Sequence, residues 1–266
     1  MTVYVITHKP IESPLDKGYT PMLIGADFNK NPKHYKTDNT GRNISSKNKE
    51  YCELTGLYWM WKNSTEKNVG LNHYRRFFFS HDIGGRNAMY LWLLITGRAH
   101  TISENTLSNW IDTKKYDWIV AHPERMDAKP LYKQFILHHN EKDLEHTRDA
   151  IKKLYPDYLP SYDKFLHSKA SMSPYNMFYT SKENMDEYCE WLFNILFEVE
   201  KHSDLSGYDD YQRRLFGFLG ERLFNVWLMH HSNLKIKYLT VYNTSDTNRA
   251  EMISHVKNGI KKIFHK

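Results

Sequence analysis

The pattern of apolar and polar positions between residues 47 and 62 predicts a helix that faces a core. Apolar and aromatic residues recur there at spacings of three and four, the period of an amphipathic helix. These residues are Tyr51, Leu54, Tyr58 and Trp61. Ser46 stands at the position of an N-cap, and Glu50 falls in the first turn, where a carboxylate suits the positive end of the helix dipole. We therefore expect the helix to begin near Ser46.

A strand pattern follows this helix and is interrupted by charge. Residues 69–79 are mostly apolar and end in three consecutive phenylalanines, but the run breaks at His73-Tyr74-Arg75-Arg76. Two adjacent guanidinium groups beside a core strand lose hydration that only an anion or a paired carboxylate replaces. One interpretation is that the two planar groups bind a diphosphate. The other is that the arginines point to opposite faces and that each pairs with an Asp or Glu of the fold.

The rest of the first half alternates between strands and helices. Residues 2–7 carry no charge and predict a strand that is buried on both faces. Thr7 and His8 lie at its carboxyl end, the edge where ligands bind in open α/β sheets. Further strands are expected at residues 22–26 and 116–121, and helices at residues 88–95 and 102–111. This alternation is typical of a mainly parallel sheet flanked by helices.

The second half is mainly helical. Helices are expected at residues 131–154, 183–200 and 215–231, a strand or strand entry at 172–179, and a last strand at 235–241. Glu221 and Arg222 interrupt the apolar pattern of the third helix, so they form either an internal ion pair or part of a reaction site. No linker rich in Pro, Gly or Ser divides the chain. We therefore predict one domain over residues 1–247 and a C-terminal helix over residues 248–266.

The composition of the 266 residues, 40% hydrophobic and 26% charged, is typical of a soluble globular protein. The formal charge of +6 is spread among many acids and forms no blocks, which argues against a nucleic-acid partner. Cys52 and Cys189 lie in helical patterns among apolar residues, as free buried thiols do, so we expect a reducing, cytoplasmic compartment. No signal peptide is expected, and no apolar run approaches the roughly 18 residues of a membrane span.

Four segments carry a resemblance to a known family. They are NISSKNKEYCELTGLYWMWKN, GLNHYRRFF, YNMFY with EYCEWLF, and RRLFGFLGERLFNVWL, in this order along the chain. In them the chain resembles the bacterial capsular and exopolysaccharide biosynthesis family that was first described only as a domain of unknown function and is now grouped with the glycosyltransferases. The resemblance covers residues 2–239. It implies a UDP-sugar donor, a growing glycan acceptor and a GT-A-like single α/β domain, with galactofuranosyl transfer as an activity of the family.

The resemblance also raises the question of a metal. A GT-A sheet ordinarily carries an Asp-x-Asp motif at the end of the strand that follows the early helices, where a divalent cation neutralises the leaving diphosphate. Here that strand ends in the His73 to Arg76 tetrapeptide, and no Asp-x-Asp occurs near it. We therefore expect no metal and no cofactor, with Mn²⁺ or Mg²⁺ as the alternative. Arg75 and Arg76 are then the groups that stabilise the departing UDP.

Transfer with inversion needs a carboxylate that accepts the proton of the acceptor hydroxyl. Glu221 is the first choice because the most specific sequence flanks it, and Asp209 and Asp210 are the alternatives. A structural role for Glu221, as a partner of Arg213 or Arg222, stays open. The residues expected to bind the donor are Thr7, His8, Asn43, Ser45, Asn48, His73, Tyr74, Arg75, Arg76 and Asn176. The alternative function is a non-catalytic protein that binds a sugar nucleotide or a glycan.

The predicted C-terminal helix is basic and amphipathic. One face holds Ile253, Val256, Ile260, Ile263 and Phe264, and the rest carries Lys257, Lys261, Lys262 and Lys266. A helix of this kind binds membrane surfaces, here the inner face of the membrane, which would suit an acceptor carried on a lipid. An alternative of equal weight is that the apolar face of this helix packs against the core of the domain.

Overall fold

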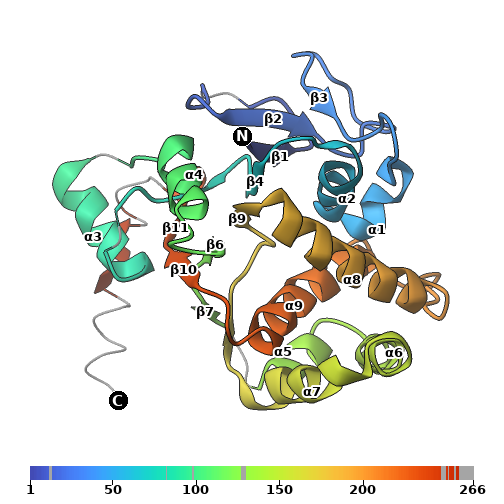
Figure 1. Cartoon of the computed structure of the whole chain (residues 1–266). Coiled ribbons are helices and arrows are strands. Elements are labelled where there is room, and N and C mark those ends of the chain that lie inside the picture. Colours follow the sequence, from blue (N-terminus) through green and yellow to red (C-terminus); the bar gives the residue numbers. More distant parts are fainter. Residues whose placement is uncertain are drawn as a thin grey trace.

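A mixed sheet of nine strands runs through the centre of the computed structural model (Figure 1). The structure describes residues 1–11, 14–81, 83–97, 99–126, 130–246, 250, 252–254 and 256–257. Seven strands follow the order β10-β6-β9-β4-β1-β2-β3, while β5 and β11 continue from β4. The strands are β1 (Thr2–Thr7), β2 (Tyr19–Leu23), β3 (Lys36–Thr37), β4 (Asn68–His73), β5 (Arg76–Phe78), β6 (Trp118–Ala121), β9 (Phe178–Ser181), β10 (Ile236–Leu239) and β11 (Val241–Asn243). A separate antiparallel pair joins β7 (Glu124–Arg125) to β8 (Ser171–Met172).

Parallel pairing dominates the sheet. β1 is parallel to β2 and to β4, so that Ile6 lies beside His73, and β6 is parallel to β10. β9 enters between β4 and β6 and is antiparallel to both, and β5 is antiparallel to β4 and β11. The predicted sheet, mainly parallel and flanked by helices, is therefore confirmed, with two strands, β5 and β9, that run opposite to the others.

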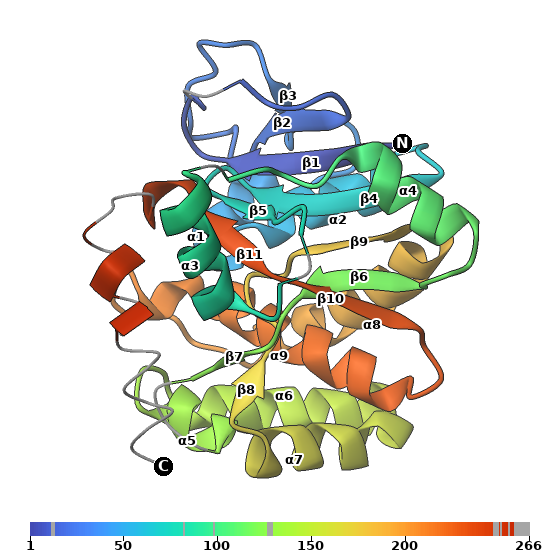
Figure 2. The same cartoon turned by 90° about the vertical axis from the view of Figure 1, so that its left-hand side faces the viewer.

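Helices cover both faces of the sheet because the side chains of its strands alternate between two cores. Tyr4 and Ile6 of β1 point into one core with α2, α8 and α9, and Val3 and Val5 point into the other with α3 and α4. Figure 2 looks onto the α3 and α4 side. The helices are α1 (Asn48–Tyr51), α2 (Leu54–Asn63), α3 (Arg86–Thr96), α4 (Glu104–Asp112), α5 (Leu131–Ile136), α6 (Glu141–Leu154), α7 (Leu159–Ser168), α8 (Lys182–Glu200) and α9 (Leu215–His230). Four 3-10 turns complete them: η1 (Ser45–Lys47), η2 (Pro156–Tyr158), η3 (Gln212–Arg214) and η4 (Thr244–Asp246).

The prediction of a single helix from residue 47 to residue 62 is wrong, because the helical conformation is interrupted between α1 and α2. Cys52 has φ 51° and ψ −126°, which no helix contains. The Asn48 amide donates to the Cys52 carbonyl (2.8 Å) and to the Thr55 hydroxyl (2.9 Å), and that hydroxyl donates to the buried Asp38 carboxylate (2.6 Å). The local bonds of Asn48 and the bond from Thr55 to Asp38, which lies in a loop outside the helix, together stabilise the break against the periodic pattern.

Other elements differ from the expectation in their limits. The strand or strand entry expected at residues 172–179 leads into β9, which begins at Phe178, and a loop at residues 173–177 separates it from β8. The range 131–154, expected to be helical, holds two helices, α5 and α6, and the last strand is split into β10 and β11. The helix expected at residues 102–111 is α4, and Ser103 caps it by accepting a hydrogen bond from Thr106 N (3.2 Å). Period and capping signals thus located the elements, while turns set by tertiary contacts divided them.

Most of the predicted C-terminal helix lies outside the described residues. In its described part, residues 250, 252–254 and 256–257 are helical. Met252 is buried, and Val256 packs against the same core as α3 and α4, whereas Ile253 is exposed. The first turn therefore faces the domain through Met252 and Val256. No described helix is both long enough and apolar enough to cross a membrane.

Candidate functional site

A cleft of about 1020 Å³ opens at the carboxyl ends of β1 and β4. Thr7 and His8 enter it from the end of β1, and His73 from the end of β4. The parallel register of these strands places both ends on the same edge. Ala121, at the end of β6, does not line the cleft, but residues 124–126 just beyond it do. The carboxyl ends of β1 and β4 therefore meet at one cleft, while the end of β6 itself stays outside it.

The tetrapeptide after β4 forms the tip of a hairpin. His73 of β4 pairs with Arg76 of β5, which leaves Tyr74 and Arg75 in the turn. The Arg75 guanidinium carbon lies 4.9 Å from the centre of the Tyr74 ring, and that of Arg76 lies 4.1 Å from the Tyr175 ring. No described Asp or Glu lies within 4.0 Å of either guanidinium group. Both arginines line the cleft, so their donors are available to an anion.

Positive charge gathers at the β1 side of this hairpin. The His8 ring meets the Tyr74 ring edge to face at 5.3 Å, and the Lys9 ammonium lies 5.3 Å from the centre of the Tyr74 ring. Burial lowers the pKa of His8, and the charges of Lys9, Arg75 and Arg214 lower it further. His8 is therefore held neutral beside three cations.

A strained turn between β8 and β9 organises the centre of the cleft. Tyr175 and Asn176 both have positive φ, 74° and 51°, which is costly for residues with a Cβ. In this turn the Tyr175 N–H donates to the Glu221 carboxylate (2.8 Å), and the Asn176 amide donates to the Glu53 carboxylate (2.8 Å). The Tyr175 carbonyl lies 2.7 Å from Nε2 of His73. The strained backbone of this turn therefore directs three polar contacts toward the centre of the cleft.

The pKa values of both carboxyl groups are raised, that of the buried Glu53 and that of the half-buried Glu221. Glu53 is 9% exposed, and burial raises its pKa, although the hydrogen bond from Asn176 opposes this. Burial also raises the pKa of Glu221, and the neighbouring charge of Glu53 raises it further. Raised carboxyl pKa values in a cleft are typical of groups that exchange protons.

Glu221 forms no ion pair with Arg213 or Arg222, the two arginines that were expected as possible partners. Arg222 donates instead to the Phe218 carbonyl (2.9 Å) and to the Gln134 side chain (2.5 Å). Within the described part of the chain, no Arg or Lys nitrogen lies within 4.0 Å of the Glu221 carboxylate. Glu221 and Arg222 therefore make no direct ion pair, although the charge of Arg222 opposes the rise in the pKa of Glu221.

His73 is neutral in this environment. Burial lowers its pKa to about 4, and the charge of Arg76 contributes to the shift. Because the Tyr175 carbonyl can only accept, Nε2 of His73 carries the proton and donates it (2.7 Å). His73 therefore holds the strained turn in place.

The far end of the cleft is formed by η3, α5 and α9. The Arg214 Nε donates to the Cys52 sulfur (3.3 Å), and burial raises the pKa of this thiol to about 12. The His139 ring stacks on the Tyr211 ring at 5.3 Å, with 14° between their planes. This end therefore offers flat ring surfaces beside arginines.

Most of the residues expected to form the site line this cleft. They are Thr7, His8, Asn48, His73, Tyr74, Arg75, Arg76, Asp210 and Glu221. Asn43 and Ser45 lie elsewhere: the Asn43 amide donates to the Gly41 carbonyl (3.1 Å), and the Ser45 hydroxyl donates to Asp38 (2.6 Å). Asp209 accepts a hydrogen bond from Gln212 N (2.7 Å), at the first residue of η3, and does not line the cleft. Asn176 is 1% exposed and reaches the site only through its hydrogen bond to Glu53.

Sequence reasoning missed several residues of the cleft, and three of them matter most for its chemistry. Glu53 sits between Cys52 and Leu54 in a helical pattern, and this acid inside an apolar stripe is the signal that was available. Tyr175 and Arg214 also line the cleft, but their spacing carries no signal, because their roles depend on the strained turn and on η3.

The residues at the end of β4 do not fit a divalent cation. Arg75 and Arg76 follow β4 in the lining of the cleft, and guanidinium groups have donors but no acceptor for a metal. In the described ranges no three His, Cys, Asp or Glu side chains are grouped to hold a metal ion.

Comparison with known proteins agrees with the fold. A solved structure described as the apo form of the bifunctional glycosyltransferase WbbM superposes with a TM-score of 0.80 at 27% identity, over 92% of this chain and 45% of that chain. The chain thus spans less than half the length of that protein, and its fold is GT-A-like. No curated protein matches the chain. A family model matches residues 2–232, which is most of the sequence. The chain therefore belongs to the family described as a domain of unknown function, DUF4422.

Proposed function

We propose that the protein is a glycosyltransferase that moves a hexose, with galactofuranose as one candidate, from a UDP-sugar to a growing capsular or exopolysaccharide acceptor. One observation carries the proposal: Arg75 and Arg76, without carboxylate partners among the described residues, share a cleft with the buried carboxyl group of Glu53 and the half-buried one of Glu221. Fixed cations beside a carboxylate suit a reaction in which a diphosphate leaves and a hydroxyl loses a proton. The likeness to a bifunctional glycosyltransferase supports the same conclusion.

The donor is oriented by the two ends of the cleft. The nucleoside contacts Thr7, His8 and Asn48, beside the end of β1. The diphosphate lies on Arg75 and Arg76, whose planar guanidinium groups each donate two parallel hydrogen bonds to phosphate oxygens. These arginines take the part of a metal ion, since their charge offsets the charge that develops on the leaving group.

The chemical step is a displacement at the anomeric carbon of the donor sugar. The acceptor hydroxyl oxygen forms a bond to this carbon while the bond from the carbon to the β-phosphate oxygen breaks, and that electron pair leaves with UDP. The hydroxyl proton passes to the Glu221 carboxylate. The raised pKa of Glu221 makes it a stronger base than an ordinary carboxylate, and the hydrogen bond from Tyr175 N holds it in position (2.8 Å).

Two measurements test this proposal together. Calorimetric titration with UDP tests donor binding, and UDP release from a panel of UDP-sugars, with and without oligosaccharide acceptors, tests turnover. We expect UDP to bind and one UDP-sugar to be hydrolysed or transferred in preference to the others. UDP binding without release from any donor would instead identify a non-catalytic sugar-nucleotide-binding protein. Absence of UDP binding would contradict both functions.

A further inference from the structure

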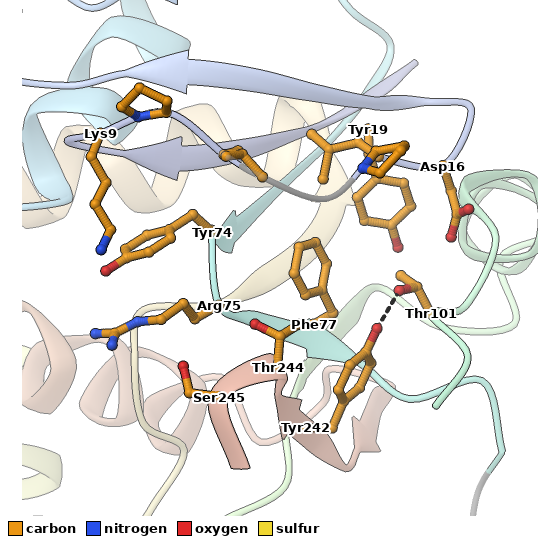
Figure 3. Close-up of a pocket in the computed structure, with 14 residues that line it drawn as sticks. Lys9, Asp16, Tyr19, Tyr74, Arg75, Phe77, Thr101, Tyr242, Thr244 and Ser245 are labelled. Atoms are coloured by element: carbon orange, nitrogen blue, oxygen red, sulfur yellow. Dashed lines mark hydrogen bonds between the residues drawn. The ribbon is translucent and has the colours of Figure 1, made fainter. Parts of the chain in front are cut away.

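A second cavity of about 410 Å³ adjoins the cleft behind the hairpin turn. Tyr74 and Arg75 line both spaces, so the cavity and the cleft meet at the hairpin turn. Figure 3 shows Lys9, Tyr74 and Arg75 at one end of this cavity and Asp16, Thr101 and Tyr242 at the other. Its volume lies within the range of about 300–1,000 Å³ that small-molecule sites occupy. None of the steps proposed above uses this cavity.

Three aromatic rings from three strands form one wall of the cavity. Phe77 of β5 lies between Tyr19 of β2 and Tyr242 of β11, with ring centres 6.2 Å and 6.0 Å apart. The Tyr19 hydroxyl donates to the Ile102 carbonyl (2.7 Å), and the Tyr242 hydroxyl shares a hydrogen bond with Thr101 (2.6 Å). Because both hydroxyls are held by the protein, the rings are fixed in place before any ligand binds.

The charges of the cavity differ between its two ends. Lys9 and Arg75 stand at the end next to the cleft, and both flank the Tyr74 ring. The exposed Asp16 carboxylate stands at the far end, where no described residue pairs with it. A phosphate would be repelled from that end, whereas a carboxylate readily accepts hydrogen bonds from the hydroxyl groups of a neutral ligand.

We propose that this cavity is a saccharide subsite for the acceptor glycan, an inference that rests on the proposed function. A pyranose ring presents C–H bonds on its faces and hydroxyls at its edges. The C–H bonds lie well against the negative faces of Tyr and Phe rings, and Asp16 accepts hydrogen bonds from the hydroxyls. A glycan held here extends past Tyr74 and Arg75 into the cleft, where its terminal hydroxyl meets the donor.

Two variants test the subsite without altering the cleft. Asp16→Asn removes the charged acceptor, and Leu15→Trp fills the cavity from a half-buried loop position. Asp149→Asn and Leu154→Trp, on exposed positions of α6, are the matched controls. The probes are methyl glycosides of galactose, glucose, mannose and rhamnose. Saturation-transfer NMR of the full chain, with and without saturating UDP, reports their binding, and calorimetry reports UDP binding.

We expect Asp16→Asn to weaken glycoside binding about tenfold, since a hydrogen bond to a charged group is lost. Leu15→Trp should abolish the glycoside signal, while both variants bind UDP as the wild type does and both controls behave as the wild type. Glycoside binding that survives both variants, or no glycoside binding to the wild type, overturns the proposal. Loss of UDP binding in Leu15→Trp also overturns it, because the nucleotide would then be the occupant. Failure of the wild type to bind UDP contradicts the proposed function instead.

Discussion

At the scale of single residues, the site combines buried acids with accessible cations. Glu53 and Glu221 are held by donors from one strained turn, and burial raises the pKa of both. Arg75 and Arg76 lie over tyrosine rings instead of beside carboxylates. Buried acids lower stability unless their charge is matched, so their presence beside accessible arginines indicates a function.

Glu221→Gln should abolish turnover while leaving UDP affinity nearly unchanged. The amide has the shape of the carboxylate and still accepts the hydrogen bond from Tyr175 N, but it does not take up a proton. We expect UDP release to fall by a factor of about 10² or more, as for the loss of a general base. Calorimetry with UDP is the control for folding and binding. Retained activity would transfer the role to Glu53 or Asp210.

Glu53→Gln should increase the free energy of unfolding at pH values above the ordinary pKa of a glutamate. A carboxyl whose pKa is raised by folding stabilises the native state while protonated, and this contribution is lost as the pH rises from about 4.5 through the raised value. Each unit of the shift corresponds to about 1.4 kcal/mol. Urea unfolding at pH 4.5 and pH 8 should therefore show a gain for the variant at pH 8 alone. An equal effect at both values would show that the charge of Glu53 is not the cause.

Arg75→Lys and Arg76→Lys should each weaken UDP binding about tenfold, because lysine keeps the charge but loses the two parallel hydrogen bonds. Calorimetry measures the change. Arg148→Lys is the matched control, since Arg148 pairs with Asp163 on the helical side of the molecule (2.8 Å). Unchanged UDP affinity in both variants would mean that the arginines attract the diphosphate only through their positive charge.

At the scale of elements, turns held by tertiary contacts shape the site. The uncharged run of β1 and the capped pattern of α4 were predictable because period and capping act locally. The break at Cys52 was not, since it depends on Asp38, which lies in another loop. The turn at Tyr175 was equally hidden, because its strain is balanced by contacts with distant residues.

Replacements of Asn176 separate backbone strain from side-chain contact. Asn176→Gly accepts a φ of 51° freely but loses the hydrogen bond to Glu53, so we expect a loss of about 1–2 kcal/mol in the free energy of unfolding. Asn176→Ala loses the same bond and is disfavoured at positive φ, which adds about 1 kcal/mol. Urea unfolding measures both values.

The control for this pair is Lys114→Gly, because Lys114 has a φ of 53° at the exposed end of α4. This variant should be as stable as the wild type or more stable. If Asn176→Gly also matched the wild type, the contact with Glu53 would contribute nothing to folding.

At the scale of the whole molecule, the sheet topology assembles the site from distant segments. β9 enters between β4 and β6, which brings the turn at Tyr175 next to His73 and places α9 across the cleft. The mainly parallel sheet, and the edge of it at which the cleft lies, could be predicted from the sequence pattern. The hydrogen bonds from Asn176 to Glu53 and from Tyr175 to Glu221 could not be predicted, because no local sequence pattern shows which strands are neighbours.

The most direct test of the account is the rate of UDP release from the preferred UDP-sugar after treatment with EDTA. The proposed function assigns the charge that stabilises the leaving diphosphate to Arg75 and Arg76, which line the cleft after the end of β4. It therefore predicts that EDTA leaves the rate unchanged and that added Mn²⁺ or Mg²⁺ does not increase it. A rate that is lost in EDTA and restored by either cation would contradict it.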